Sequence, residues 1–207
     1  MGNENATKKR IRDEALKLIN EKGFENVTLS DICEASGINK HTFYYYFKAK
    51  DELLKQFYNI PCHLDAFDLS NIFTSDSFVE QLWLLRKKII GFLTGSGVTI
   101  TKQLLIKNLS SDVGTFTLSE ERKRLMALQK TLIEKGQASG EILSKTGSDV
   151  LLVLLNQSMY SAIFTWCVKN GSFDIWDFMR FMFEKILQVS EEHCKMRDFS
   201  LHEVWKV

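Results

Sequence analysis

Apolar residues recur every three or four positions along most of the chain, and this spacing is typical of the buried face of an α-helix. The first stripe predicts a helix from about Ala6 to Lys22. Its apolar members are Ile11, Ala15, Leu18 and Ile19. Gly23 then acts as a stop signal, because glycine readily adopts the left-handed conformation in which many helices end.

Two shorter helices are predicted next, each with its own N-terminal capping residue. Thr28 and Asp31 have the spacing of a capping box, so a helix is expected to start just after Thr28. Gly37 ends this helix, and Asn39 caps a third helix from about Lys40 to Phe47. Two short helices joined by a turn that contains glycine make a helix-turn-helix.

The rest of the chain predicts longer helices. A fourth helix begins at Lys50 and ends near Ile60, because Pro61 cannot continue it. The segment from Asn59 to Ser77 is predicted to be an irregular connection. Further apolar periodicities predict helices over residues 77–93, 98–109, 119–138, 148–169 and 173–194. The tail, residues 195–207, is left without an assigned structure.

Composition agrees with an all-α globular protein. Apolar residues make up 44% of the chain and charged residues 26%, which is ordinary for a folded domain. A single proline and the scarcity of alternating β-branched runs argue against a sheet. We therefore expect helices throughout.

The formal net charge of +1 hides a basic N-terminal quarter. The stretch from Lys8 to Arg12 is basic, and Lys40, Lys48 and Lys50 follow. A basic end on a neutral body suits a protein that touches a polyanion with one end. A solvated helix face explains the same charges.

The cysteine pattern indicates neither a disulfide framework nor a metal site. The four cysteines form no Cys-x-x-Cys pair, and the adjacent pairs Cys62-His63 and His193-Cys194 do not make a metal site by themselves. Free thiols and the lack of an apolar signal segment predict a cytoplasmic protein. We expect no metal and no cofactor.

One apolar segment, from Val150 to Val168, is about long enough to span a bilayer. Polar residues interrupt its centre at Asn156, Gln157 and Ser158. A helix buried on most of its faces explains it better than a membrane span, so no membrane partner is expected.

The most informative stretch runs from Thr28 to Leu54. It reads Thr-Leu-Ser-Asp-Ile-Cys-Glu-Ala-Ser-Gly-Ile-Asn-Lys-His-Thr-Phe-Tyr-Tyr-Tyr-Phe-Lys-Ala-Lys-Asp-Glu-Leu-Leu. It resembles the DNA-binding signature of the TetR family of transcriptional regulators (TetR/AcrR type), with its capping Thr, its glycine turn, a "tlYyyF" helix and a "sKeeLl" start to the fourth helix. Cys33 stands where alanine is usual. The resemblance covers about the first quarter of the chain, and the remainder is similar only in length and helical layout.

The resemblance implies where DNA would bind. The start of a recognition helix points into the major groove, so Lys40, His41 and Thr42 are the expected base readers. By resemblance, the tyrosines, Lys50 and Thr28 contact phosphates. The predicted DNA-binding residues are Thr28, Asn39, Lys40, His41, Thr42, Tyr44, Tyr45, Tyr46 and Lys50. Core packing is the alternative for such a run of aromatics, and it suits Phe43 and Phe47 better than the tyrosines.

The resemblance also implies a helical C-terminal domain that binds a small molecule and pairs two subunits through the last two long helices. The predicted dimerisation residues are Leu152, Leu155, Met159, Ile163, Phe178, Met182 and Ile186. An ordinary monomeric core explains the same stripes. The need to bind two DNA half-sites favours the dimer.

An apolar or aromatic effector is expected, because the C-terminal domain is rich in large apolar residues. The predicted ligand-binding residues are Trp83, Phe92, Phe116 and Trp166. Plain core packing is an alternative for each of them. The cations Lys102, Lys107 and Arg86 could meet an anionic group of the effector, and solvated faces explain them equally well.

The sequence thus predicts a helix-turn-helix DNA-binding domain over residues 1–49 and a helical effector-binding and dimerisation domain over residues 50–207. The expected function is a repressor that binds a palindromic operator as a homodimer and is released by a small effector. An enzyme is disfavoured, since no nucleophile elbow, phosphate loop or metal motif is present and no catalytic residue is assigned. A DNA-binding regulator without a ligand stays open, as do the operator, the effector and the choice between repression and activation.

Overall fold

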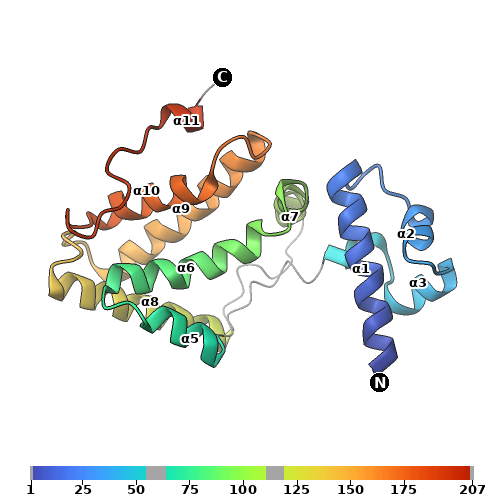
Figure 1. Cartoon of the computed structure of the whole chain (residues 1–207), viewed down its shortest axis with the longest axis horizontal. Coiled ribbons are helices and arrows are strands. Elements are labelled where there is room, and N and C mark those ends of the chain that lie inside the picture. Colours follow the sequence, from blue (N-terminus) through green and yellow to red (C-terminus); the bar gives the residue numbers. More distant parts are fainter. Residues whose placement is uncertain (1, 55–63, 111–118, 206–207) are drawn as a thin grey trace. The chain divides into compact units, whose positions relative to one another are not determined.

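The structure is a computed structural model, and it describes residues 2–54, 64–110 and 119–205 (Figure 1). Within these ranges every regular element is helical, apart from an isolated antiparallel β-bridge between Ile142 and Val189. The all-α prediction is confirmed.

The chain forms two compact units. The first contains Met1–Ile60 and Leu93–Thr115, and the second contains Pro61–Phe92 and Phe116–Val207. The first unit therefore takes in a later segment of the chain in addition to its N-terminal helices. The expected division between residues 49 and 50 separates a DNA-binding domain from an effector-binding domain, and it stays a prediction.

The first unit is built on a long helix that shorter ones cover. Its elements are α1 (Gly2–Lys22), α2 (Leu29–Ala35), α3 (Lys40–Tyr46), the 3₁₀ turn η1 (Lys50–Leu54) and α7 (Val98–Ser110). Helix α1 packs against α2, η1 and α7. The predicted stripe is buried here at Ile11, Ala15 and Ile19, so one face of α1 forms the centre of this small core.

The second unit is a stack of longer helices. Its elements are α5 (Ala66–Phe73), α6 (Phe78–Thr94, which ends in the first unit), α8 (Glu120–Ser139), α9 (Ser148–Val168), α10 (Ile175–Leu187) and α11 (His202–Trp205). Helix α9 lies between α8 and α10 and packs against both. Fully buried side chains such as Leu82, Ile133 and Phe183 form the core.

One predicted irregular segment and one predicted helix end are wrong. Helix α5 lies inside the segment expected to be irregular, where Asp65 and Asp68 form a capping box that the sequence reading overlooked. Helix α10 ends at Leu187 and does not reach Cys194, because Gln188 adopts a left-handed conformation with φ of 53°. The backbone turn there lets the carbonyl of Gln188 accept from the Leu143 amide at 3.1 Å.

The start of the fourth predicted helix is described only as η1. Residues 55–63, and with them the expected stop at Pro61, lie outside the described residues.

Helix α9 is, by length and composition, one described helix that could cross a membrane. Its Leu151, Leu155, Met159 and Ile163 are nevertheless buried within the unit. Core helices of globular proteins have the same composition, and this burial accounts for the inward-facing part of the apolar run.

Candidate functional site

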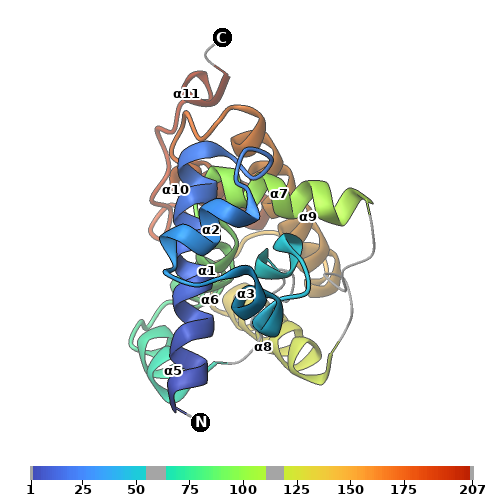
Figure 2. The same ribbon diagram turned by 90° about the vertical axis from the view of Figure 1, so that its right-hand side faces the viewer.

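The first candidate site is the helix-turn-helix of α2 and α3, which Figure 2 shows in front of α1. Thr28 caps α2 by accepting from the Asp31 amide at 3.2 Å, and the Asp31 carboxylate accepts from the Thr28 amide and hydroxyl, each at 2.7 Å. The hydrogen bond from the Thr28 hydroxyl has the largest effect in lowering the pKa of Asp31, and the bond from the Thr28 amide lowers it further. The predicted capping box is thus present. A phosphate contact by the Thr28 hydroxyl would have to replace its bond to Asp31.

Asn39 caps the recognition helix α3. Its side-chain oxygen accepts from the Thr42 amide at 2.8 Å and from the Thr42 hydroxyl at 3.0 Å. The hydroxyl proton of Thr42 is therefore already used, and its lone pairs and methyl group are what it offers to a base. Lys40 and His41 are exposed beside it. The start of α3 thus presents a cation, an imidazole and a methyl group on a rigid helix end.

The aromatic run of α3 divides between core and surface. Phe43 is fully buried and Phe47 is 5% exposed, and their rings pack with centroids 5.5 Å apart. Tyr44 and Tyr45 are more than half exposed. This matches the expected division, in which the phenylalanines hold the helix and the tyrosines stay outside. Tyr46 is half-buried, with its ring edge-to-face against Tyr45 at 4.9 Å.

Lys50, a predicted phosphate contact, has a structural role that the sequence reading missed. Its ammonium donates to the carbonyls of Phe24 at 2.6 Å and Val27 at 3.0 Å, and it lies 4.1 Å from the centre of the Phe24 ring. Carbonyls near the C-terminal end of a helix attract cations. The predicted end of the first helix at Lys22 was therefore the signal in the sequence that could have indicated this role of Lys50. Lys50 thereby closes the connection between α1 and α2. One of its three N–H groups is left over for a phosphate.

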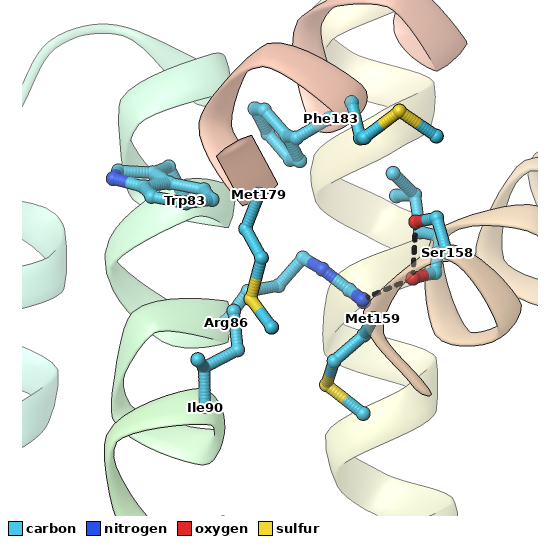
Figure 3. Close-up of a pocket in the computed structure, with 9 residues that line it drawn as sticks. Trp83, Arg86, Ile90, Ser158, Met159, Met179 and Phe183 are labelled. Carbon is cyan, nitrogen blue, oxygen red and sulfur yellow. Dashed lines mark hydrogen bonds between the residues drawn. The ribbon is translucent and has the colours of Figure 1, made fainter. Parts of the chain in front are cut away.

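A second candidate site is a small cavity in the second unit, where α6, α9 and α10 meet (Figure 3). Its volume is about 10 Å³, room for roughly one water molecule. Its walls are Trp83, Arg86 and Ile90 from α6, Leu155, Ser158 and Met159 from α9, and Met179, Met182 and Phe183 from α10.

Arg86 is the charged group of this cavity, and it is only 3% exposed. Its guanidinium donates to the side-chain oxygens of Gln129 at 2.9 Å and Asn156 at 3.2 Å, and to the Leu155 carbonyl at 2.7 Å. Burial lowers the pKa of Arg86 to about 10, so it is still protonated at neutral pH. The alternative prediction that Arg86 lies on a solvated helix face is therefore wrong.

The predicted ligand-binding residues are not brought together. Trp83 lines the cavity, whereas Phe92 and Trp166 are not among its lining residues, and Phe116 lies outside the described residues. The side chain of Trp166 packs by the turn at Gly171. The methionines and Arg86 are the lining residues that the prediction left out. Helical periodicity could mark them as inward-facing but could not say that they converge.

The predicted dimerisation residues are used mainly by the protomer itself. Five of them are buried in its core, namely Leu152, Leu155, Met159, Ile163 and Phe178. Met182 and Ile186 are half-buried. A different row of α9 is exposed. We call it the outer row of α9, and it consists of Val150, Val153, Leu154, Phe164 and Val168.

No metal site emerges from the described ranges. No three His, Cys, Asp or Glu side chains among those residues are grouped so that they could hold an ion. The pair Cys62-His63 lies outside the described residues.

A second buried arginine of this unit, Arg180, is ion-paired with the carboxylates of Glu80 and Glu184.

The family model for bacterial regulatory proteins of the tetR family matches residues 11–57, which hold the helix-turn-helix. The HTH-type transcriptional regulator AcrR of Shigella flexneri is 26% identical over 136 residues, 66% of this chain and 52% of that protein. The match thus spans about half the length of that relative. The fatty acid metabolism regulator protein of Bacillus subtilis is 24% identical over 171 residues, 80% of this chain and 86% of that protein.

A solved structure has the same fold. It is the transcriptional regulator FadR from Bacillus subtilis in complex with stearoyl-CoA, with a TM-score of 0.57 at 19% identity, over 86% of this chain and 96% of that one. The two relatives and this neighbour are all named as regulators. Residues 11–57, which hold the helix-turn-helix, thus match the DNA-binding segment of the tetR family, and the longer matches show that this chain is similar to regulators of that family.

Proposed function

We propose that this protein is a repressor that binds a palindromic operator as a homodimer and leaves it when a small apolar effector binds the second unit. The observation that carries the proposal is the start of α3, where Lys40 and His41 are exposed on a capped helix over a rigid aromatic core. TetR-family regulators bind operator DNA, usually as dimers, and work in the cytoplasm.

The exposed side of α3 supplies both kinds of DNA contact. Lys40 is suited to donate to guanine O6 and N7, and the Thr42 methyl group suits the methyl of thymine. The exposed hydroxyls of Tyr44 and Tyr45 suit phosphate oxygens, which position the protein without specifying sequence. The hydrogen bonds of Asn39 indicate a capping role more than a direct contact.

The outer row of α9 is the better surface for the second subunit. Its five members are each between 46% and 62% exposed, and they form two apolar groups at helical spacing, Val150–Leu154 and Phe164–Val168, with the exposed Gln157 and Ser161 between them. Pairing along it would bury apolar area that is otherwise in water, and the predicted inner residues would support it from beneath. A dimer would place two copies of α3 about 34 to 36 Å apart, one in each half-site.

The effector would enter among α6, α9 and α10. The related FadR is solved with stearoyl-CoA, which supports an effector with an apolar chain for this protein as well. A cavity of about 10 Å³ cannot hold such a molecule, so binding has to open it. An effector that binds the open state better than the closed one shifts the population away from the DNA-binding form.

The test is binding of the purified full chain to duplexes from its own upstream region, by gel shift across a salt series. We expect a saturable complex of two or four subunits on one palindrome, weakening steeply as salt rises. Equal, weak binding to every duplex would contradict operator recognition. Tight binding that no apolar compound relieves would favour the alternative, a regulator that acts without a ligand.

A further inference from the structure

The second unit contains a buried cation that is ion-paired with no carboxylate of the described residues. Arg86 is 3% exposed, and all three acceptors that it reaches are neutral: an amide oxygen of Gln129, another of Asn156, and a backbone carbonyl. No carboxylate in the described part of the chain is ion-paired with it. This arrangement leaves the positive charge solvated by dipoles alone.

A second arginine of the same unit shows how such burial is otherwise accommodated. Arg180 is 5% exposed, and it pairs with the carboxylates of Glu80 and Glu184. Removing a charge from water is costly, and an opposite charge in good geometry offsets much of that cost. Arg86 bears the same desolvation without that compensation. An anion from outside the chain would supply it.

The surroundings of Arg86 restrict which anion this could be. Its guanidinium extends from α6 across the cavity towards the backbone of α9, next to Ser158 (Figure 3). The Ser158 hydroxyl donates to the same Leu155 carbonyl at 2.9 Å, so it lies beside the guanidinium, and it would have to give up that bond to donate to an anion. Beyond this polar corner the walls are Met159, Met179 and other apolar side chains. The site therefore offers one small polar corner to a compact anion and apolar surface to the rest of the ligand.

We propose that Arg86 binds the carboxylate of an amphiphilic effector, a carboxylic acid whose apolar chain lies among the methionines of α9 and α10. This inference rests on the proposed effector-responsive function and names the chemical class of the effector. A carboxylate matches the planar fork of a guanidinium with two parallel hydrogen bonds.

The small cavity volume agrees with a closed state that the ligand opens. Methionine side chains are unbranched and change rotamer at low cost, so Met159 and Met179 can withdraw. A carboxylate on Arg86 would compete with the Leu155 carbonyl and with the amide oxygen of Asn156, both on α9. Ligand binding would thereby loosen the connection between α6 and α9.

The experiment compares two ligands of the same length that differ in charge. Binding of dodecanoate and of the neutral methyl dodecanoate to the full chain is measured through tryptophan fluorescence, because Trp83 lines the cavity. We expect dodecanoate to bind at least about ten-fold more tightly, the difference that a hydrogen bond to a charged group supports. Equal affinities in the wild-type protein would overturn the proposal without any variant being needed.

Variants then assign the preference to Arg86. Arg86→Gln keeps hydrogen-bond donors but removes the charge, and it should bring the two affinities within about two-fold of each other, while Arg86→Lys keeps part of the preference. The control, Lys87→Gln, removes an exposed cation of the same helix α6 that does not line the cavity, and the preference should survive. An undiminished preference in Arg86→Gln would refute the role of Arg86.

A DNA-release assay separates this inference from the proposed function. Dodecanoate that binds through Arg86 but leaves the operator complex intact would uphold the inference and contradict release by this class of effector. An operator complex that is released only by neutral apolar compounds, with no binding of dodecanoate, would uphold the function and overturn the inference.

Discussion

The replacement Lys50→Met separates two roles that the same residue could have. The resemblance to TetR regulators implies a contact with DNA phosphate. The structure instead shows the ammonium holding the carbonyls of Phe24 and Val27 at 2.6 and 3.0 Å and the Phe24 ring at 4.1 Å. Methionine keeps an unbranched apolar stem of nearly the same length but removes every one of these interactions.

The expected loss of stability follows from these contacts. A hydrogen bond from a charged donor is worth about 1.5 to 3 kcal/mol, and we take roughly a third of that for each because Lys50 is half-exposed. The cation–π contact adds about 0.5 kcal/mol. The free energy of unfolding should therefore fall by about 2 kcal/mol. With a urea dependence of about 2 kcal/mol per M, the unfolding midpoint moves down by about 1 M.

The assay combines urea unfolding with the salt dependence of operator binding. Each phosphate contact contributes about 0.9 to the slope of log K against log salt concentration. We expect Lys50→Met to lower the unfolding midpoint and to leave that slope nearly unchanged. The control is Lys48→Met, because Lys48 is exposed two residues away, and its midpoint should match that of the wild type. A normal midpoint for Lys50→Met together with a slope reduced by a full contact would refute the structural role.

Four further predictions concern other parts of the molecule. Lys40→Ala should weaken operator binding by about 1 to 3 kcal/mol and relax specificity at one base pair, as binding to a set of single-base operator variants would show. Phe164→Glu places a charge in the outer row of α9, so the dimer should dissociate in light scattering, and an unchanged mass would contradict pairing there. Gly136→Ala should cost about 1 to 3 kcal/mol in thermal unfolding, since the new Cβ would lie 2.7 Å from Ile142. Burial raises the pKa of Glu184, but the hydrogen bonds to its carboxylate outweigh this effect and hold the pKa below 4.5. The stabilising effect of the carboxylate is therefore present above pH 4.5 and is lost as the pH falls further. The difference in unfolding free energy between the wild type and Glu184→Gln should accordingly shrink in acid.

Much of the helix-turn-helix could be predicted from the sequence because its determinants are local. The Thr28 and Asp31 capping box and the Asn39 cap depend on residues three positions apart, and both are present in the structure. The division between buried Phe43 and exposed Tyr45 likewise follows from helical spacing within one turn or two. The family resemblance came from this same stretch.

The second unit shows where local pattern stops being informative. Helix α9 is apolar around most of its circumference, so periodicity could not say which of its apolar residues face inward and which form the outer row. The end of α10 at Leu187 depends on a bridge to Ile142, a residue more than forty positions earlier. Neither feature leaves a signal within one turn of helix.

Most of the helices, the caps of the recognition helix and the resemblance to DNA-binding regulators could be predicted from the sequence, since these depend on neighbours within a few residues. The environments of Lys50 and Arg86 emerged only once the chain was folded. One ammonium is drawn to backbone carbonyls 23 and 26 residues away, and one guanidinium is buried among acceptors 43 to 70 residues away. The sequence alone does not indicate whether a charged side chain is solvated or buried. What it does is decided by the desolvation and the partners that folding brings to it.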